Sequence, residues 1–213
     1  MSDTVDDAAL RARYWPVPLL RALPAAVIAL VITFSSNHAT PYGLVLFGVF
    51  AIVEGVVLGV GSATRLDDPR ARRLAIVQAA VTVVAGVAAE FLPGAGLPAF
   101  LALVTAFALV TGGIELVQGL LARRSSPFAR DWMTVGGLTI LLAVAFLLTP
   151  PDYSKDLGGI EHVHGTLDSS IILVGLLGAY LALTAVFHVI AGLSHKWGTT
   201  APTPTTPDGA PHA

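Results

Sequence analysis

Long apolar runs separated by short polar segments make up most of the sequence. In the clearest run, residues 96–122 carry a single charged side chain, Glu115, and the run ends on the pair Arg123 and Arg124. A helix rises ~1.5 Å per residue, so this run is long enough to cross the ~30 Å hydrocarbon core of a bilayer with room for tilt. We therefore predict that it forms a transmembrane helix.

Five further runs repeat this design, and segments rich in turn-forming residues separate them. Pro16 and Pro18 can occupy a first helical turn, and Pro150 with Pro151 ends the fifth run. The predicted fold class is all-α: a polytopic membrane protein with six transmembrane helices as three helical hairpins. The predicted helices cover 18–34, 43–62, 74–89, 97–122, 132–149 and 169–194 of a membrane domain 15–197, between a polar leader, 1–14, and a disordered Thr- and Pro-rich tail, 198–213.

The composition leaves lipid as the only solvent that fits the chain. Hydrophobic residues make up 54% of the 213 residues and charged residues only 12%, with a mean hydropathy of +0.76. Soluble domains carry roughly 25% charged residues, so the usual water-facing surface is missing. The net charge of −2 indicates no nucleic-acid partner, and the absence of cysteine excludes disulfides and thiolate metal sites. The expected partner is the lipid bilayer.

Basic residues predict the orientation. When the connections are numbered alternately inside and outside, starting inside, eleven of the twelve Lys and Arg residues fall inside and Lys155 falls outside. This asymmetry follows the positive-inside rule, and it predicts that both termini are cytoplasmic. The three tryptophans, Trp15, Trp132 and Trp197, lie at the inner helix ends, where aromatic rings anchor at the headgroups.

The six predicted helices suggest an internal repeat of two helices. Arg residues stand at or just before the inner ends of the odd helices, and an ionisable residue lies ~6–8 residues, or ~9–12 Å, from the inner end of each even helix. Residues 109–120, LVTGGIELVQGL, also align with residues 182–193, ALTAVFHVIAGL. The arginines are Arg21, Arg73 and Arg130, and the intramembrane residues are Glu54, Glu115 and His188.

The Arg-led odd helices and the segments 48–59, GVFAIVEGVVLG, and 108–119, ALVTGGIELVQG, resemble the HdeD-like acid-resistance membrane proteins, which are built from short repeats of unknown function. The resemblance covers about residues 15–196. It implies a six-helix protein of the bacterial inner membrane, linked to acid or other stress and without an established activity. The third repeat departs from the pattern, because it has His188 in place of an acidic residue and a longer outer loop.

The intramembrane residues support two interpretations. Ionisable groups in a bilayer cost at least ~2.5–3.5 kcal/mol, so they normally face protein or water. Glu54, Glu115 and His188 can form a proton-responsive cluster, because carboxyl and imidazole groups change charge on acidification. Alternatively, Arg21 and Arg73 reach down to Glu54 and Glu115 and clamp each hairpin. We prefer the structural interpretation.

The remaining chemistry is sparse. His162 and His164 in the outer loop can share one side of an extended segment, but two loop histidines are more often solvated, and we expect no metal site and no cofactor. The sequence contains no phosphate-binding loop or nucleophile elbow, so we expect no enzyme. The alternative function is a small proton-coupled transporter or channel. A homo-oligomer through the small-residue faces of the second or fourth helix, such as Gly55-x-x-x-Gly59, is a further expectation.

Overall fold

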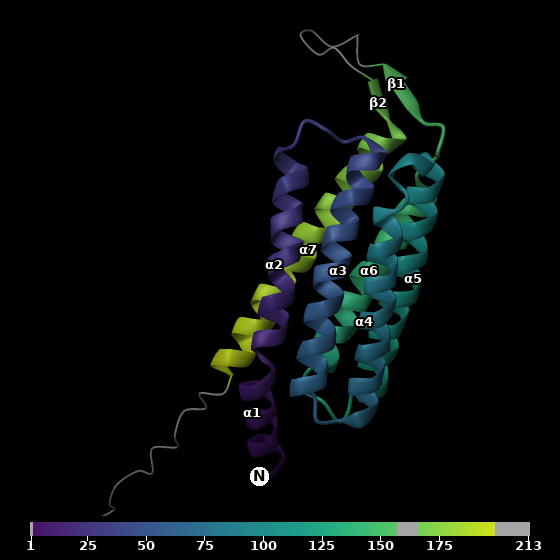
Figure 1. Cartoon of the computed structure of the whole chain (residues 1–213). Helices are drawn as coiled ribbons and strands as arrows, with labels where there is room; N and C mark the ends of the chain where they lie inside the picture. The colour runs from purple at the N-terminus through teal and green to yellow at the C-terminus, as the bar shows by residue number, and fades with distance from the viewer. Residues whose placement is uncertain (1, 157–165, 199–213) are drawn as a thin grey trace, which may run out of the picture.

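The computed structural model describes residues 2–156 and 166–198 and shows a bundle of long, roughly parallel helices (Figure 1). Within these residues, six helices are long and apolar enough to cross a membrane, which confirms the predicted all-α membrane fold. Their ends differ from the predicted ones by five residues at most, at the start of α4. The six are α2 (Pro16–Phe34), α3 (Thr40–Arg65), α4 (Pro69–Glu90), α5 (Gly96–Ala122), α6 (Ala129–Leu148) and α7 (Ser169–Trp197).

Four short elements complete the described chain. The polar leader forms helix α1 (Ser2–Tyr14), and the turn before α5 contains a 3-10 helix, η1 (Pro93–Ala95). The strands β1 (Ser154–Asp156) and β2 (Thr166–Asp168) form an antiparallel hairpin in the loop between α6 and α7. His162 and His164 lie outside the described residues. The same is true of the predicted tail, 198–213, apart from its first residue.

Acidic side chains begin two of the long helices. Asp68 accepts hydrogen bonds from the backbone N–H groups of Arg70 and Ala71 at the start of α4, and Pro69 fills the first helical position. Asp168 accepts one from the N–H of Ile171 at the start of α7. These caps fix the points at which the chain re-enters the bundle.

The N-terminal helix α1 and the C-terminal end of α7 lie at the same end of the molecule. Helix α1 and the end of α7 lie at the lower end in Figure 1, and the β-hairpin and the α2–α3 loop lie at the upper end. An even number of spans requires this arrangement. We call the end with α1 the inner end and the end with the β-hairpin the outer end.

The closest helix packing does not follow the predicted hairpins. Those hairpins paired the first helix with the second, the third with the fourth and the fifth with the sixth. In the structure, the three most extensive helix contacts are those of α3 with α4, α5 with α6, and α2 with α7. The helices of the first two pairs are consecutive in the chain and are linked by the connections at the inner end. The third pair brings together the first and last of the six long helices.

Glycines explain this pairing, because they let the backbones of two helices approach each other. A Cβ atom added to Gly48 of α3 would lie 3.0 Å from the carbonyl oxygen of Gly86 in α4, and one added to Gly112 of α5 would lie 3.0 Å from that of Gly136 in α6. Seven residues further along α5, a Cβ on Gly119 would lie 2.7 Å from the carbonyl oxygen of Ala129. The small-residue faces expected to form an oligomer therefore pack within one chain.

The glycine contacts also set the register of the repeats. Gly119 of α5 faces Ala129 and Met133 of α6. In the same way, Gly192 of α7 faces Leu19 of α2 and Trp15, the residue just before α2. This places Gly192 in the position of Gly119. With α7 aligned to α5 in this way, Thr184 corresponds to Thr111 and His188 to Glu115, in agreement with the predicted alignment of 182–193 with 109–120. All of these residues are buried except Trp15, Leu19 and Met133, which are half-buried.

The first repeat has a different register from the one predicted. Gly48 and Gly55 of α3 occupy the positions of Gly112 and Gly119 of α5, so Glu54 corresponds to Gln118 and lies three residues, or about 4.5 Å, closer to the inner end than Glu115 does. The predicted equivalence of Glu54 and Glu115 is wrong.

The predicted equivalence of the three arginines is also wrong. Val83 of α4 faces Gly55 as Leu19 of α2 faces Gly192, so Arg21, two residues after Leu19, corresponds to Ala85. Arg73 and Arg130 lie at the inner helix ends and are exposed, whereas Arg21 lies deeper in the bundle and is buried.

Two apolar clusters fill the bundle. In the larger cluster, ring centroids lie 5.1 Å apart for Phe47 and Phe107 and 5.6 Å apart for Phe100 and Phe146, and both pairs are edge-on. The smaller cluster, at the inner end, includes Tyr14. Large apolar side chains, Phe34 and Leu121 among them, are exposed around the outside of the helices, as a lipid-facing surface requires.

Adjacent glycines in α6 provide a test of this packing. A Cβ on Gly136 would lie 2.5 Å from the backbone nitrogen of Leu116, whereas one on Gly137 would meet nothing within 4 Å. We expect Gly136→Ala to lower the free energy of unfolding by about 1–3 kcal/mol through overpacking. SDS titration in mixed micelles, followed by far-UV circular dichroism, measures this change. Gly137→Ala is the control and should cause no loss; equal losses in both variants would contradict the packing.

Candidate functional site

Arg21 forms ion pairs with two carboxylates inside the bundle. Its Nε donates to Oε1 of Glu54 at 2.5 Å, and its Nη1 donates to Oε1 of Glu115 at 2.9 Å. The residues are only 6%, 6% and 3% exposed, respectively. One guanidinium group of α2 therefore joins α3 and α5.

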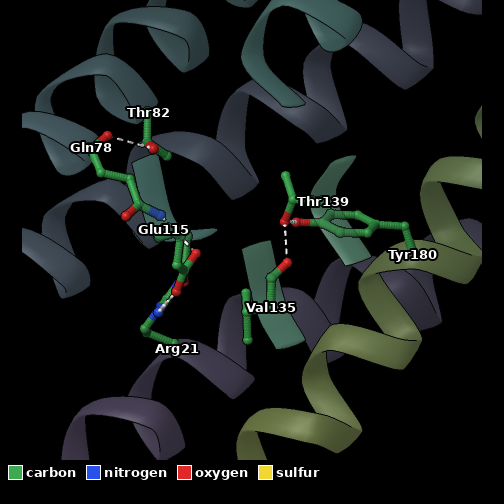
Figure 2. A network of polar contacts seen from close by, with 8 residues as sticks. Arg21, Gln78, Thr82, Glu115, Val135, Thr139 and Tyr180 are labelled. Atoms are coloured by element: carbon green, nitrogen blue, oxygen red, sulfur yellow. Dashed lines mark hydrogen bonds and ion pairs between the residues drawn. The ribbon is translucent and has the colours of Figure 1, made fainter. Parts of the chain in front are cut away.

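A fourth helix binds the other oxygen of Glu115. Gln78 of α4 donates from Nε2 to Oε2 of Glu115 at 2.8 Å, and the Thr82 hydroxyl donates to the Gln78 carbonyl oxygen at 2.8 Å. Figure 2 shows Glu115 between Gln78 and Arg21. Both Glu115 oxygens thus have hydrogen bonds, which fixes the orientation of this carboxylate. We call Arg21, Glu54, Glu115 and Gln78 the central cluster.

The charges of the central cluster do not balance. One guanidinium group faces two carboxyl groups, so the cluster carries a net charge of −1 when both are ionised. Oε2 of Glu54 is buried and has no hydrogen-bond partner in the described part of the chain. Unpaired charge in a low-dielectric interior is costly, so a proton or a water molecule at this oxygen would stabilise the cluster.

The central cluster borders a small cavity. About 20 Å³ of this cavity is open to the centre of a water molecule, which is room for one or two waters. On its far side, the Thr139 hydroxyl of α6 lies 2.9 Å from the Tyr180 hydroxyl of α7 and donates to the Val135 carbonyl oxygen (Figure 2). Helices α2 to α7 all contribute to the lining of this cavity.

His188 completes the predicted set of residues. It lies on α7, is buried, and lines the cavity together with Glu54 and Glu115. Neither its Nε2 nor the Thr184 hydroxyl has a hydrogen-bond partner among the described residues. The structure therefore brings Glu54, Glu115 and His188 to one cavity, and whether their role is functional or structural stays a prediction.

The predicted clamp is confirmed for the first hairpin, where Arg21 pairs with Glu54, and is wrong for the second, where Arg73 does not pair with Glu115. Arg73 and Arg130 are exposed at the inner end, and Arg21 takes both carboxylates. The reason is the register described above, because only Arg21 starts deep enough in its helix to reach Glu54 and Glu115. The clamp thus connects different repeats, since Glu115 belongs to the second one.

Sequence reasoning missed two members of the site. Gln78 was not considered, although an amide four residues before Thr82 in an apolar run marks one polar helix face. The Tyr180 hydroxyl group, which pairs with that of Thr139, was missed as well, since no signal in the sequence singles it out. The described residues contain no group of three or more His, Cys, Asp or Glu side chains that could hold a metal ion.

The fold and the site define a polytopic helical membrane protein with an intramembrane charge cluster. The chain matches the family described as "Short repeat of unknown function (DUF308)" twice, at residues 20–89 and 77–149, and it belongs to this family. Each match covers parts of three consecutive long helices and the two share α4, as expected for a repeat of two helices. No curated protein and no solved structure matches the chain.

Removing the buried guanidinium group tests the central cluster. We expect Arg21→Gln to lower the free energy of unfolding by about 3–5 kcal/mol at neutral pH, because it leaves two buried carboxylates without their counter-charge. The loss should shrink as the pH falls, since protonation removes the charge from the carboxylates. SDS titration at several pH values measures both effects.

The matched control is Arg73→Gln, an exposed residue whose replacement should change the stability by less than about 0.5 kcal/mol. Adding Glu54→Gln to Arg21→Gln should recover part of the loss. If Arg21→Gln and Arg73→Gln are equally stable at neutral pH, the ion pairs do not stabilise the bundle.

Proposed function

We propose that this chain is a non-enzymatic protein of a bacterial cytoplasmic membrane that serves resistance to acid or other stress, as an HdeD-like protein. The resemblance of its helices to that family and the two matches to the short-repeat family support this proposal. The observation that carries it is the double ion pair of Arg21, which joins carboxylates of two repeats within the apolar bundle.

The geometry around the central cluster favours this role over solute transport. The cavity has room for one or two water molecules, too little for an organic solute. On the outer side, buried side chains including Phe47, Phe107 and Leu177 close the bundle. These features support a stable scaffold whose charge state responds to pH.

Lipid is the partner proposed for the exposed apolar surface. A homo-oligomer would need another surface than the glycine faces, because α4 and α6 already cover Gly48 and Gly112 within the chain. We infer no catalytic activity, since the central cluster offers acidic and basic groups but no nucleophile beside a base.

A proton-coupled transporter or channel is the second candidate. It is favoured by one observation: Glu54, Glu115 and His188 surround the same cavity, and two of them carry buried atoms without hydrogen-bond partners in the described residues. Proton transfer needs only water-sized spaces, so the small cavity is compatible with proton movement.

Reporter fusions test the proposed orientation. We expect alkaline phosphatase, which is active only outside the cytoplasm, to be inactive after residue 124 and active after residue 152. The arginine-rich connections should stay inside. The reverse pattern at these two positions would overturn the assignment of the inner end to the cytoplasm.

A growth test and a flux test separate the two candidate functions. We expect a deletion strain to grow more slowly than its parent at low pH, and the wild-type chain, but not Arg21→Gln, to restore growth. Arg73→Gln is the control and should restore growth fully. Proteoliposomes carrying the purified chain should leak protons no faster than protein-free liposomes.

Either result can contradict the proposal. Equal growth of the deletion strain and its parent under acid stress would remove the stress role. Proton flux above the protein-free background that Glu115→Gln abolishes would favour the transporter or channel.

A further inference from the structure

A second polar pair lies between the central cluster and the inner end of the bundle. Nε2 of His195, in the last turn of α7, lies 2.6 Å from Oδ2 of Asp131, in the first turn of α6. The His195 side chain is 4% exposed and the Asp131 side chain 28% exposed. Asp131 therefore meets solvent at the inner end, and His195 lies behind it in the bundle.

A second cavity connects this pair with the central cluster. About 10 Å³ of it is open to the centre of a water molecule, which is close to the room for one water. Asp131, His195 and Ala191 line it toward the inner end. Arg21, Glu115 and His188 line both this cavity and the first one, so the two spaces adjoin at these side chains.

Several buried atoms without partners belong to residues that line the two cavities. Within the described residues, no hydrogen bond reaches Nδ1 of His195, Nε2 of His188 or Oε2 of Glu54. His188 and His195 lie seven residues apart on one face of α7, a rise of about 10 Å. Buried polar atoms without protein partners beside polar cavities of this size are typical sites of bridging water.

The outer part of the described core differs. It contains Phe47, Phe100 and Phe146, none of which is measurably exposed, and its buried polar atoms without partners, Glu90 Oε1 and Thr105 Oγ1, line neither cavity. Water-sized cavities lined in part by polar side chains thus extend from the central cluster toward the inner end of the bundle.

We propose that the Asp131–His195 pair and His188 form a proton route from water at the inner end to Glu54. A hydronium ion at the inner end gives its proton to the Asp131–His195 pair and leaves as water. The proton then passes through the second cavity to His188 and through the first cavity to Oε2 of Glu54. Uptake neutralises the central cluster, because one guanidinium group then faces one carboxylate.

Other charged and titratable groups set the conditions for this uptake. Those that line the cavities beside His188 are Arg21 of α2, Tyr14 of α1, Glu54 of α3, Glu115 of α5, Asp131 of α6, and Tyr180 and His195 of α7, and α4 contributes the uncharged Gln78. A proton on Glu54 removes a negative charge from the central cluster, whereas a proton on His188 would add a second positive charge beside Arg21, so the proton ends on the carboxylate.

The route extends the proposed function and rests on the membrane placement given there. It makes the central cluster responsive to the pH on the inner side of the membrane. Its test does not depend on the stress role, because protonation of Glu54 can be measured on the purified chain whatever the growth experiment shows.

Infrared difference spectroscopy of the full chain in lipid vesicles tests the route. After a jump from about pH 7.5 to about pH 5, a range that spans histidine titration, we expect the C=O band of a protonated carboxyl group to appear. The band should be absent in Glu54→Gln. Asp131→Asn and His195→Phe should slow its appearance by at least about tenfold and leave its final amplitude unchanged.

Glu90→Gln is the matched control, because this carboxyl group lies at the outer end of α4; it should change neither the rate nor the amplitude of the Glu54 band. Far-UV circular dichroism checks that each variant folds, and Asp131→Asn, which keeps the shape of the side chain, decides if His195→Phe does not fold. A missing band, a band that persists in Glu54→Gln, or an unchanged rate in Asp131→Asn would each overturn the proposal.

Discussion

The pairing of Arg21 with two carboxylates is the constraint on which the inner half of the bundle depends. Each of these charges would be costly in hydrocarbon. They are tolerated because the Arg21 guanidinium group lies within hydrogen-bond distance of both carboxylates. The three side chains come from α2, α3 and α5, so these helices must keep a fixed depth and rotation relative to one another. Gln78 adds α4 to the same arrangement through its bond to Glu115.

Glycine contacts provide the fixed depth that the charges require. Gly48 meets Gly86 and Gly112 meets Gly136 at backbone distance, and a slip of one helical turn would bring side chains into these contacts. The apolar interfaces therefore position the polar residues. Because lipid supplies no hydrophobic driving force between helices, close backbone packing and the buried ion pairs together hold the bundle.

The sequence predicts the helices well and the site only in part, for physical reasons. A run such as 96–122 has the length and polarity of a membrane span, and spacing of three and four residues places Glu115 and Gln118 on one face of α5. Which helices touch depends on glycine contacts between distant segments, which spacing within one helix does not reveal. The pairing of Arg21 with Glu115, 94 residues away, follows from that register, and so does the exclusion of Arg73.

The three repeats share one backbone plan and divide the polar chemistry among themselves. The first repeat contributes Arg21 and Glu54, the second Gln78 and Glu115, and the third His188 with the Asp131–His195 pair. Symmetric repeats would place three like charges around one cavity, which mutual repulsion would destabilise. His188 of α7 occupies the position equivalent to Glu115 of α5, and a histidine there avoids a third carboxylate. The difference between the repeats, more than their similarity, therefore determines the charge inside the bundle.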